Sequence, residues 1–76
     1  MHRFLIIIEE GNHNYSAYVP DLPGCVATGR TQQEVEENMR RAIAMHMQGM
    51  IEDNEPIPTT HTIAEYVDVA IPDSAA

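Results

Sequence analysis

Cys25 is the single thiol of this chain, and four histidines are the bases that could activate it: His2, His13, His46 and His61. A cysteine becomes a nucleophile when a base or a positive charge lies beside it and stabilises the thiolate. No histidine stands at a sequence spacing that forces it close to Cys25. A lone cysteine within a strand is usually a small buried hydrophobic residue. We therefore expect Cys25 to pack inside the fold, and we expect no catalytic residue.

Metal chemistry has little support in the spacing of the ligand-type residues. Zinc sites use paired ligands, such as two cysteines two residues apart or two histidines one helical turn apart, and neither pair occurs. His46 falls on an apolar helical stripe, where a core or interfacial histidine is more usual. Glu9 and Glu10 end the first hydrophobic run, and a divalent-metal nuclease would need several further acids beside them. We expect no metal and no cofactor, and the nuclease remains a minor alternative.

Charge and length restrict the class of protein. The 76 residues make one domain, and the expectation is a single domain over 1–76 with a frayed tail over 72–76. The net charge is −8 and every basic side chain is an arginine, so the chain should repel nucleic acid and attract a basic protein. One cysteine suits a reducing compartment, and no apolar run is long enough to span a membrane. These features predict a cytoplasmic protein that binds no nucleic acid and no membrane directly.

Three strands and one helix follow from the hydrophobic pattern. Residues 4–8 and 15–19 read as a hairpin closed by the turn-rich residues 11–14, and residues 25–28 read as a third strand. The stretch PDLPG at 20–24 between strands two and three could be a catalytic loop or a rigid corner. Leu22 to Cys25 fits a type II turn, because Pro23 fixes φ at the second position and Gly24 tolerates positive φ at the third. The corner is the better interpretation.

The helix begins with a capping box at Thr31, with Glu34 expected to reach back to Thr31. It should run to about residue 52 or 53, with Asn54 as its left-handed stop. On the exposed face, Glu36 with Arg40 and Glu37 with Arg41 have ion-pair spacing. The buried stripe repeats every three or four residues and comprises Val35, Met39, Ala42, Ile43, His46, Met47, Met50 and Ile51.

A fourth strand is predicted over 66–71, because Val67, Val69 and Ile71 alternate with more polar residues. The fold expected is therefore α+β, a two-layer β-β-β-α-β domain with an antiparallel sheet and one long helix on one face. In the first strand Phe4, Ile6 and Ile8 face one side, while Leu5 and Ile7 face the other. One helix covers one side only, so we expect a partner, and a homodimer or higher oligomer is predicted.

The segment from Tyr15 to Pro58, YSAYVPDLPGCVATGRTQQEVEENMRRAIAMHMQGMIEDNEPIP, resembles the HicB-like antitoxin family. Its Tyr-x-Ala-x-x-Pro-Asp-Leu-Pro-Gly-Cys corner and its Glu-Pro-Ile-Pro exit from the helix carry the resemblance, which covers residues 4–71. The resemblance implies a degenerate ribonuclease-H-like fold without nuclease activity. It also implies the antitoxin role of a type II toxin–antitoxin pair, in which the chain binds and masks a small basic HicA-type ribonuclease that cleaves mRNA.

Many members of that family continue into a C-terminal DNA-binding domain, and we expect here a short form without one. An orphan oligomeric protein-binding module with no cognate toxin is the main alternative. A rigid corner loses little entropy on binding, so we expect it to contact the partner, with acids of the helix as a rim. The predicted surface comprises Tyr18, Pro20, Asp21, Leu22, Pro23, Glu36 and Glu37.

Overall fold

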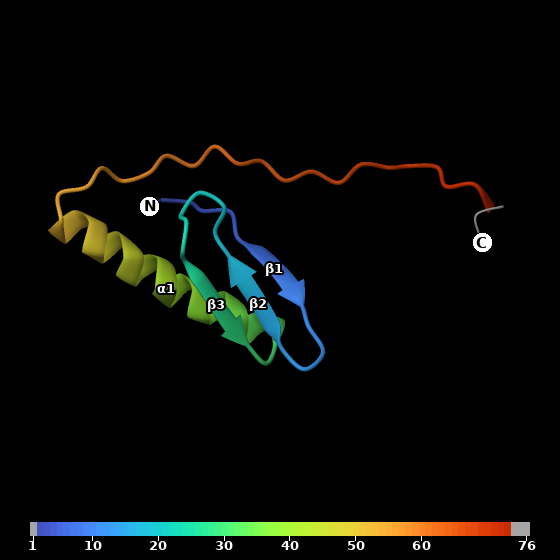
Figure 1. Ribbon diagram of the computed structural model, residues 1–76, viewed down its shortest axis with the longest axis horizontal. Coiled ribbons are helices and arrows are strands. Elements are labelled where there is room, and N and C mark those ends of the chain that lie inside the picture. Colours follow the sequence, from blue (N-terminus) through green and yellow to red (C-terminus); the bar gives the residue numbers. More distant parts are fainter. Residues whose placement is uncertain (1, 74–76) are drawn as a thin grey trace.

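Three strands and one helix follow one another along the chain in the computed structural model, which describes residues 2–73. The strands are β1 (Ile7–Glu10), β2 (Tyr15–Tyr18) and β3 (Val26–Gly29), and the helix is α1 (Gln32–Glu52). The strands form an antiparallel sheet in the order β1-β2-β3, and α1 lies across one face of it (Figure 1). The predicted α+β class, with one helix on one face of an antiparallel sheet, is confirmed.

The first strand begins and ends further along the chain than the hydrophobic run predicts. The prediction was residues 4–8, whereas the ladder begins at Ile7 and extends through Glu10. Ile7 lies opposite Tyr18, and the chain turns away immediately after it, where Val19 donates a hydrogen bond to Cys25 instead. Residues 4–6 therefore have no strand beside them on the β2 side. At the other end, the Gly11 N–H bonds to the Asn14 carbonyl at 2.7 Å and closes the hairpin, so both glutamates join the ladder.

The helix begins and ends where the sequence predicts. The Thr31 hydroxyl accepts a hydrogen bond from the Glu34 N–H at 3.0 Å. The Glu34 carboxylate, however, accepts from the Arg30 N–H at 3.0 Å, one residue before the position expected. At the other end Asn54 has a φ of 57°, and the N–H groups of Asn54 and Glu55 bond back to Ile51 and Met50, which is a Schellman ending.

The core is small and lies between the sheet and the first half of α1. Its fully buried residues are Ala17, Val19, Leu22, Cys25, Val35 and Met39. The remaining members of the predicted helical stripe are less covered, and Ile51 at the end of the helix is 54% exposed. The second half of α1 therefore extends beyond the sheet that should cover it.

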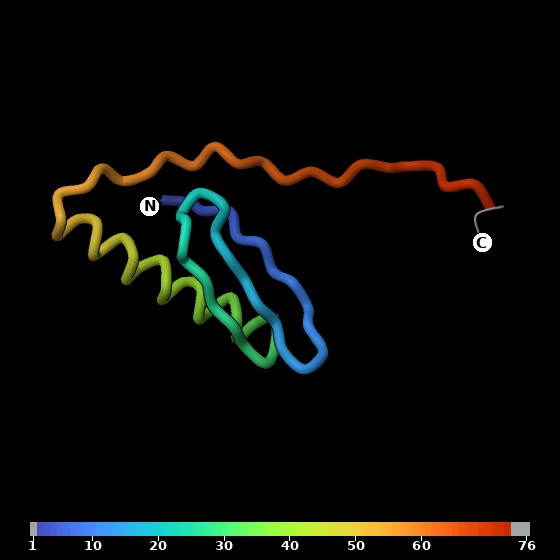
Figure 2. Tube along the Cα trace, viewed as in Figure 1, coloured from blue at the N-terminus to red at the C-terminus, as the bar shows by residue number. Residues whose placement is uncertain are grey.

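The C-terminal segment corrects the predicted topology. Residues 66–71 are not paired into the sheet, and the whole segment after α1 runs as an extended chain past the corner and away from the strands (Figures 1 and 2). The side chains expected in the core are exposed: Val67 by 79%, Val69 by 70% and Ile71 by 75%. The predicted fourth strand is therefore wrong for this structure, because alternation marks a segment that is able to pair, whereas a strand also needs an edge to pair with. The predicted frayed tail over 72–76 lies mostly outside the described residues, and the single-domain organisation stays a prediction.

Candidate partner-binding surface

The corner between β2 and β3 is built from two successive β-turns. Leu22 donates its N–H to the Val19 carbonyl at 3.1 Å, and Cys25 donates its N–H to the Leu22 carbonyl at 3.1 Å. Pro20 and Pro23 each occupy the second position of one turn, where the ring supplies the required φ. Gly24 has a φ of 84°, which confirms the type II turn predicted for the second one. The corner is therefore rigid.

Leu22 and Pro23 differ in how far the fold covers them. Leu22 is only 1% exposed and belongs to the core, whereas Pro23 is exposed. A side chain covered on all sides within its own domain cannot contact a partner. Leu22 therefore anchors the corner, and only its neighbours can form a binding surface.

Asp21 is covered by the chain's own C-terminal segment. Its Oδ1 accepts a hydrogen bond from the Thr62 hydroxyl at 2.7 Å and lies 3.9 Å from His61 Nε2. The Asp21 side chain is nearly inaccessible, and its Oδ2 has no hydrogen-bond partner within the described residues. The Thr62 hydrogen bond lowers the pKa of Asp21 against the opposing effect of burial, with His61 adding a smaller contribution. Asp21 thus fastens the extended segment to the corner.

Tyr18 belongs to a row of apolar side chains on the sheet face that α1 does not cover. Ile7, Tyr18 and Val26 are direct cross-strand neighbours, while the next row, Ile8, Ala17 and Ala27, packs against the core. Successive side chains on a strand point to opposite faces, so the first row points away from the helix. Tyr18 is 42% exposed and Val26 is 65% exposed. The predicted bare face of the sheet is present, with Tyr18 at its centre.

The two acids predicted as a rim do not adjoin Tyr18, because α1 lies on the other side of the sheet. Glu37 is exposed and forms an ion pair with Arg40 at 3.1 Å, in place of the i, i+4 pairs predicted from the sequence. Glu36 is half-buried and borders a cleft beside the N-terminal segment. The predicted surface therefore divides into a corner-and-sheet part and a separate helical part.

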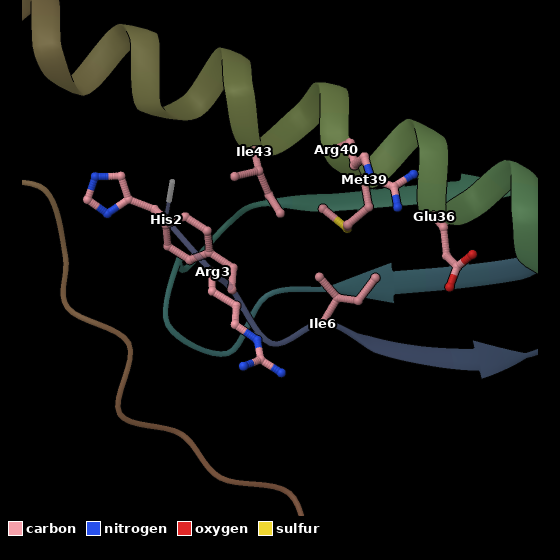
Figure 3. Close-up of a pocket in the computed structure, with 8 residues that line it drawn as sticks. His2, Arg3, Ile6, Glu36, Met39, Arg40 and Ile43 are labelled. Atoms are coloured by element: carbon pink, nitrogen blue, oxygen red, sulfur yellow. The ribbon is translucent and has the colours of Figure 1, made fainter.

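The cleft next to Glu36 is an apolar groove between the N-terminal segment and α1. It has a volume of about 410 Å³ and is lined by His2, Arg3, Phe4, Ile6, Glu36, Met39, Arg40 and Ile43. Met39 and Ile43 point from the helix toward Ile6, and arginines lie on both sides (Figure 3). This groove lies beside residues 2–6, which lead into β1, and the outer edge of β1 has no partner strand within residues 2–73. It was not predicted from the sequence, because it arises where two distant segments meet.

Two further members of the bare face were also missed as site residues. The sequence predicted that Ile7 lies on the second face of the first strand, and this prediction could have identified it as a member of the bare face. Val26 carried no such signal, since its place beside Tyr18 depends on the register of β3 against β2. Register is a tertiary property, so the row could not be assembled from spacing alone.

The residues first considered for catalysis are not gathered in one place. Cys25 is buried, and burial raises the pKa of its thiol, so the unreactive thiol form is favoured. In the described part of the chain, no group of three or more histidine, cysteine or acidic side chains could hold a metal ion. None of the helical segments found there is both long and apolar enough to cross a membrane.

The structure is thus a small α+β domain with a double-turn corner and a bare apolar sheet face. The sequence profile described as HicB-like antitoxin of bacterial toxin–antitoxin systems matches residues 4–73. The chain therefore belongs to the HicB-like antitoxin family, as the corner and the helix exit predicted. No solved structure is significantly similar to it.

Curated relatives occur in a phage, a bacterium and an archaeon. An uncharacterised 14.9 kDa protein of Haemophilus phage HP1 is 42% identical over 62 residues, which are 82% of this chain and 47% of the phage protein. The chain thus spans about half the length of that relative. A UPF0150 protein of Thermoplasma acidophilum is 35% identical over 71% of this chain and 78% of its own length. One from Synechocystis is 25% identical over 93% of this chain and 91% of its own length.

Proposed function

We propose that this chain is the antitoxin of a type II toxin–antitoxin pair, and that it binds and masks a small basic HicA-type ribonuclease in the cytoplasm. The match to the antitoxin family over residues 4–73 carries the proposal. The net charge of −8 supports it, because an RNA-cleaving protein needs a basic surface that an acidic partner attracts. Masking needs no catalysis, and no cofactor enters the proposal.

The corner and the bare sheet face form the proposed contact surface. Tyr18 supplies an aromatic anchor beside Ile7 and Val26, and Pro20 and Pro23 hold the adjoining backbone in two fixed turns. A surface that is already rigid loses little conformational entropy on binding, and aromatic anchors are frequent hot spots of interfaces. Asp21 contributes at the edge of this surface through the segment it holds, and Leu22 supports it from within.

Glu36 and Glu37 contribute to the proposed function through their charge. They lie on the helical side of the domain, so they add to the field that draws a basic protein toward the chain. The Arg40 ion pair neutralises part of this effect at Glu37. We therefore expect these acids to affect the rate of association more than the lifetime of the complex.

Co-expression with the product of an adjacent gene that encodes a short basic protein tests the proposal. We expect the two to co-purify and RNA cleavage by the basic protein to stop. Absence of both effects would contradict the antitoxin function and favour an orphan binding module. Partner-free preparations that cleave RNA, and lose this activity with a chelator, would instead support a metal nuclease.

The contact surface has its own test in the variant Tyr18→Ala. Removing the aromatic anchor should raise the dissociation constant by roughly tenfold or more, the order expected for a hot-spot tyrosine. Met45→Ala is the control, because Met45 is 75% exposed on α1, on the other side of the sheet from Tyr18. Isothermal titration calorimetry measures both. Equal affinities for the two variants would refute this surface while leaving the antitoxin function intact.

A further inference from the structure

Two complementary apolar surfaces of this chain are left uncovered. One lies on the C-terminal segment, and the other is the groove beside the N-terminal segment. Residues 63–71, which we call the arm, carry an alternating row of exposed apolar side chains at Val67, Val69 and Ile71, with Ile63 exposed at its start. The groove presents the opposite arrangement, an apolar floor next to an unpaired strand edge. An extended segment that finds such an edge gains main-chain hydrogen bonds and buries alternate side chains.

The arm does not fill the groove of its own chain. The hydrogen bond between Thr62 and Asp21 holds the start of the arm at the corner, and the arm then continues away from the sheet (Figure 1). The molecule is consequently elongated, with extents of 57 × 29 × 20 Å. Its radius of gyration is 16.2 Å, whereas a compact chain of this length would have about 11 Å. The groove stays open beside the N-terminal segment (Figure 3).

Charge indicates which occupant the groove suits. Arg3 and Arg40 line it beside a single acid, Glu36, so its lining carries a net charge of about +1 in a chain whose net charge is −8, although Arg40 also pairs with Glu37. The arm carries Glu65 and Asp68 and no basic residue. Opposite charges favour an acidic strand here, whereas the same arginines disfavour a basic toxin. The groove and the bare face around Tyr18 therefore suit different partners.

From these observations we propose that two copies of the chain exchange their arms, each placing residues 66–71 along residues 4–6 and the free edge of β1 in the other copy. Val67, Val69 and Ile71 enter the groove and pack on Phe4, Ile6, Met39 and Ile43 of the second copy. Reciprocal exchange covers the arm and the groove of both copies at once. One copy of another protein could not cover all four surfaces. It also supplies the fourth strand that the sequence pattern predicts. The exchange is independent of any toxin.

A matched pair of substitutions tests this dimer. Val69→Asp places a charge on the face of the arm that enters the groove, and Ala70→Asp places the same charge on the opposite face. Val69 and Ala70 are both exposed in the open chain, so neither change disturbs the folded core. We expect Val69→Asp to raise the dimer dissociation constant roughly 100-fold or more, because it replaces a buried apolar side chain by a charged one on the apolar floor of the groove. Ala70→Asp should behave as the unaltered chain does. Sedimentation velocity of the toxin-free protein at a series of concentrations measures these constants.

Mixed isotope labelling distinguishes exchange from other arrangements. Dimers refolded from ¹³C-labelled and unlabelled full-length chains should show contacts between the Val69 methyl groups of one copy and Ile6 or Ile43 of the other. Such contacts within a single chain would mean that the arm closes on its own groove, and would overturn the proposal. A monomer at all concentrations, a dimer insensitive to Val69→Asp, or arm amides without protection from hydrogen exchange would each overturn it as well.

Discussion

At the residue scale, Asp21 joins the beginning of the fold to its C-terminal segment. It lies in the first turn of the corner, and its partner Thr62 is 41 positions further along the chain. Because the hydroxyl and the nearby His61 favour the ionised form, the pKa of Asp21 is lowered in the folded protein. The carboxylate therefore acts as a fastener for the arm, and its strength depends on its protonation.

The lowered pKa of Asp21 predicts how the arm responds to acid. A carboxyl whose pKa is lowered by folding stabilises the folded contact fully when the pH is above its ordinary pKa of about 4. This stabilisation is lost as the pH falls through the lowered pKa. The protection factors of the amides around Thr62, which are exchange rates corrected for the intrinsic effect of pH on exchange, should accordingly fall at the acid end of this range. Asp21→Asn should remove this pH dependence, whereas Asp68→Asn, an equivalent change on the exposed arm, should retain it. Hydrogen exchange measured by mass spectrometry checks both. The same pH dependence in both variants would mean that Asp21 does not fasten the arm.

At the scale of elements, Gly29 determines how closely β3 and α1 can approach each other. A Cβ added at Gly29 would lie 2.6 Å from the Val35 backbone nitrogen and 2.9 Å from its Cα. Backbone atoms of a capped helix cannot yield to such a contact as a flexible side chain can. Only a residue without a side chain allows Val35 to be fully buried under the sheet.

Two glycine-to-alanine substitutions should therefore have opposite effects on stability. Gly29→Ala should lower the free energy of unfolding by about 1–3 kcal/mol, the usual cost of forcing extra volume into a packed site. Gly49→Ala should raise it by about 0.5–1 kcal/mol, because a glycine inside a helix is unfavourable and nothing lies within 4 Å of the new methyl group. Urea denaturation at a fixed protein concentration measures both. Equal destabilisation would show that the contact at Val35 does not limit the approach of the two elements.

At the scale of the whole molecule, charge and exposed apolar surface support two different associations. The net charge of −8 acts at long range and draws a basic partner. The arm and the groove associate mainly through apolar burial, which salt does not screen. The two interactions should therefore respond differently to ionic strength.

We expect salt to slow toxin binding while leaving the arm-exchanged dimer intact. Raising the sodium chloride concentration from about 0.05 M to 0.5 M should reduce the association rate with the basic partner roughly tenfold or more, because the Debye length shortens to a few ångströms. The dissociation constant of the dimer should change little over this range. Stopped-flow mixing measures the association rate and sedimentation measures the dimer. A dimer that dissociates in salt would contradict apolar arm exchange.

Local features of the fold followed from the sequence by itself. The type II turn at Pro23 and Gly24, the helix start at Thr31 and its end at Asn54 were all predicted, because each depends on backbone preferences of a few adjacent residues. The corner and the helix exit also indicated the family, as the profile match confirmed. The bare sheet face followed from the two-sided first strand, although its members Tyr18 and Val26 needed the register to be brought together.

Only the tertiary structure decided where the predicted strands and contacts go. Alternation at 66–71 describes a segment able to pair, but the pairing edge lies far along the chain, so the sequence could not show that the arm leaves its own sheet. Likewise, Leu22 and Asp21 are neighbours in one corner, yet one is in the core and the other is covered by the arm. Local backbone preferences act through adjacent residues, whereas burial and strand pairing depend on which distant segments meet. For this reason the groove and the unpaired arm could be recognised only in the tertiary structure.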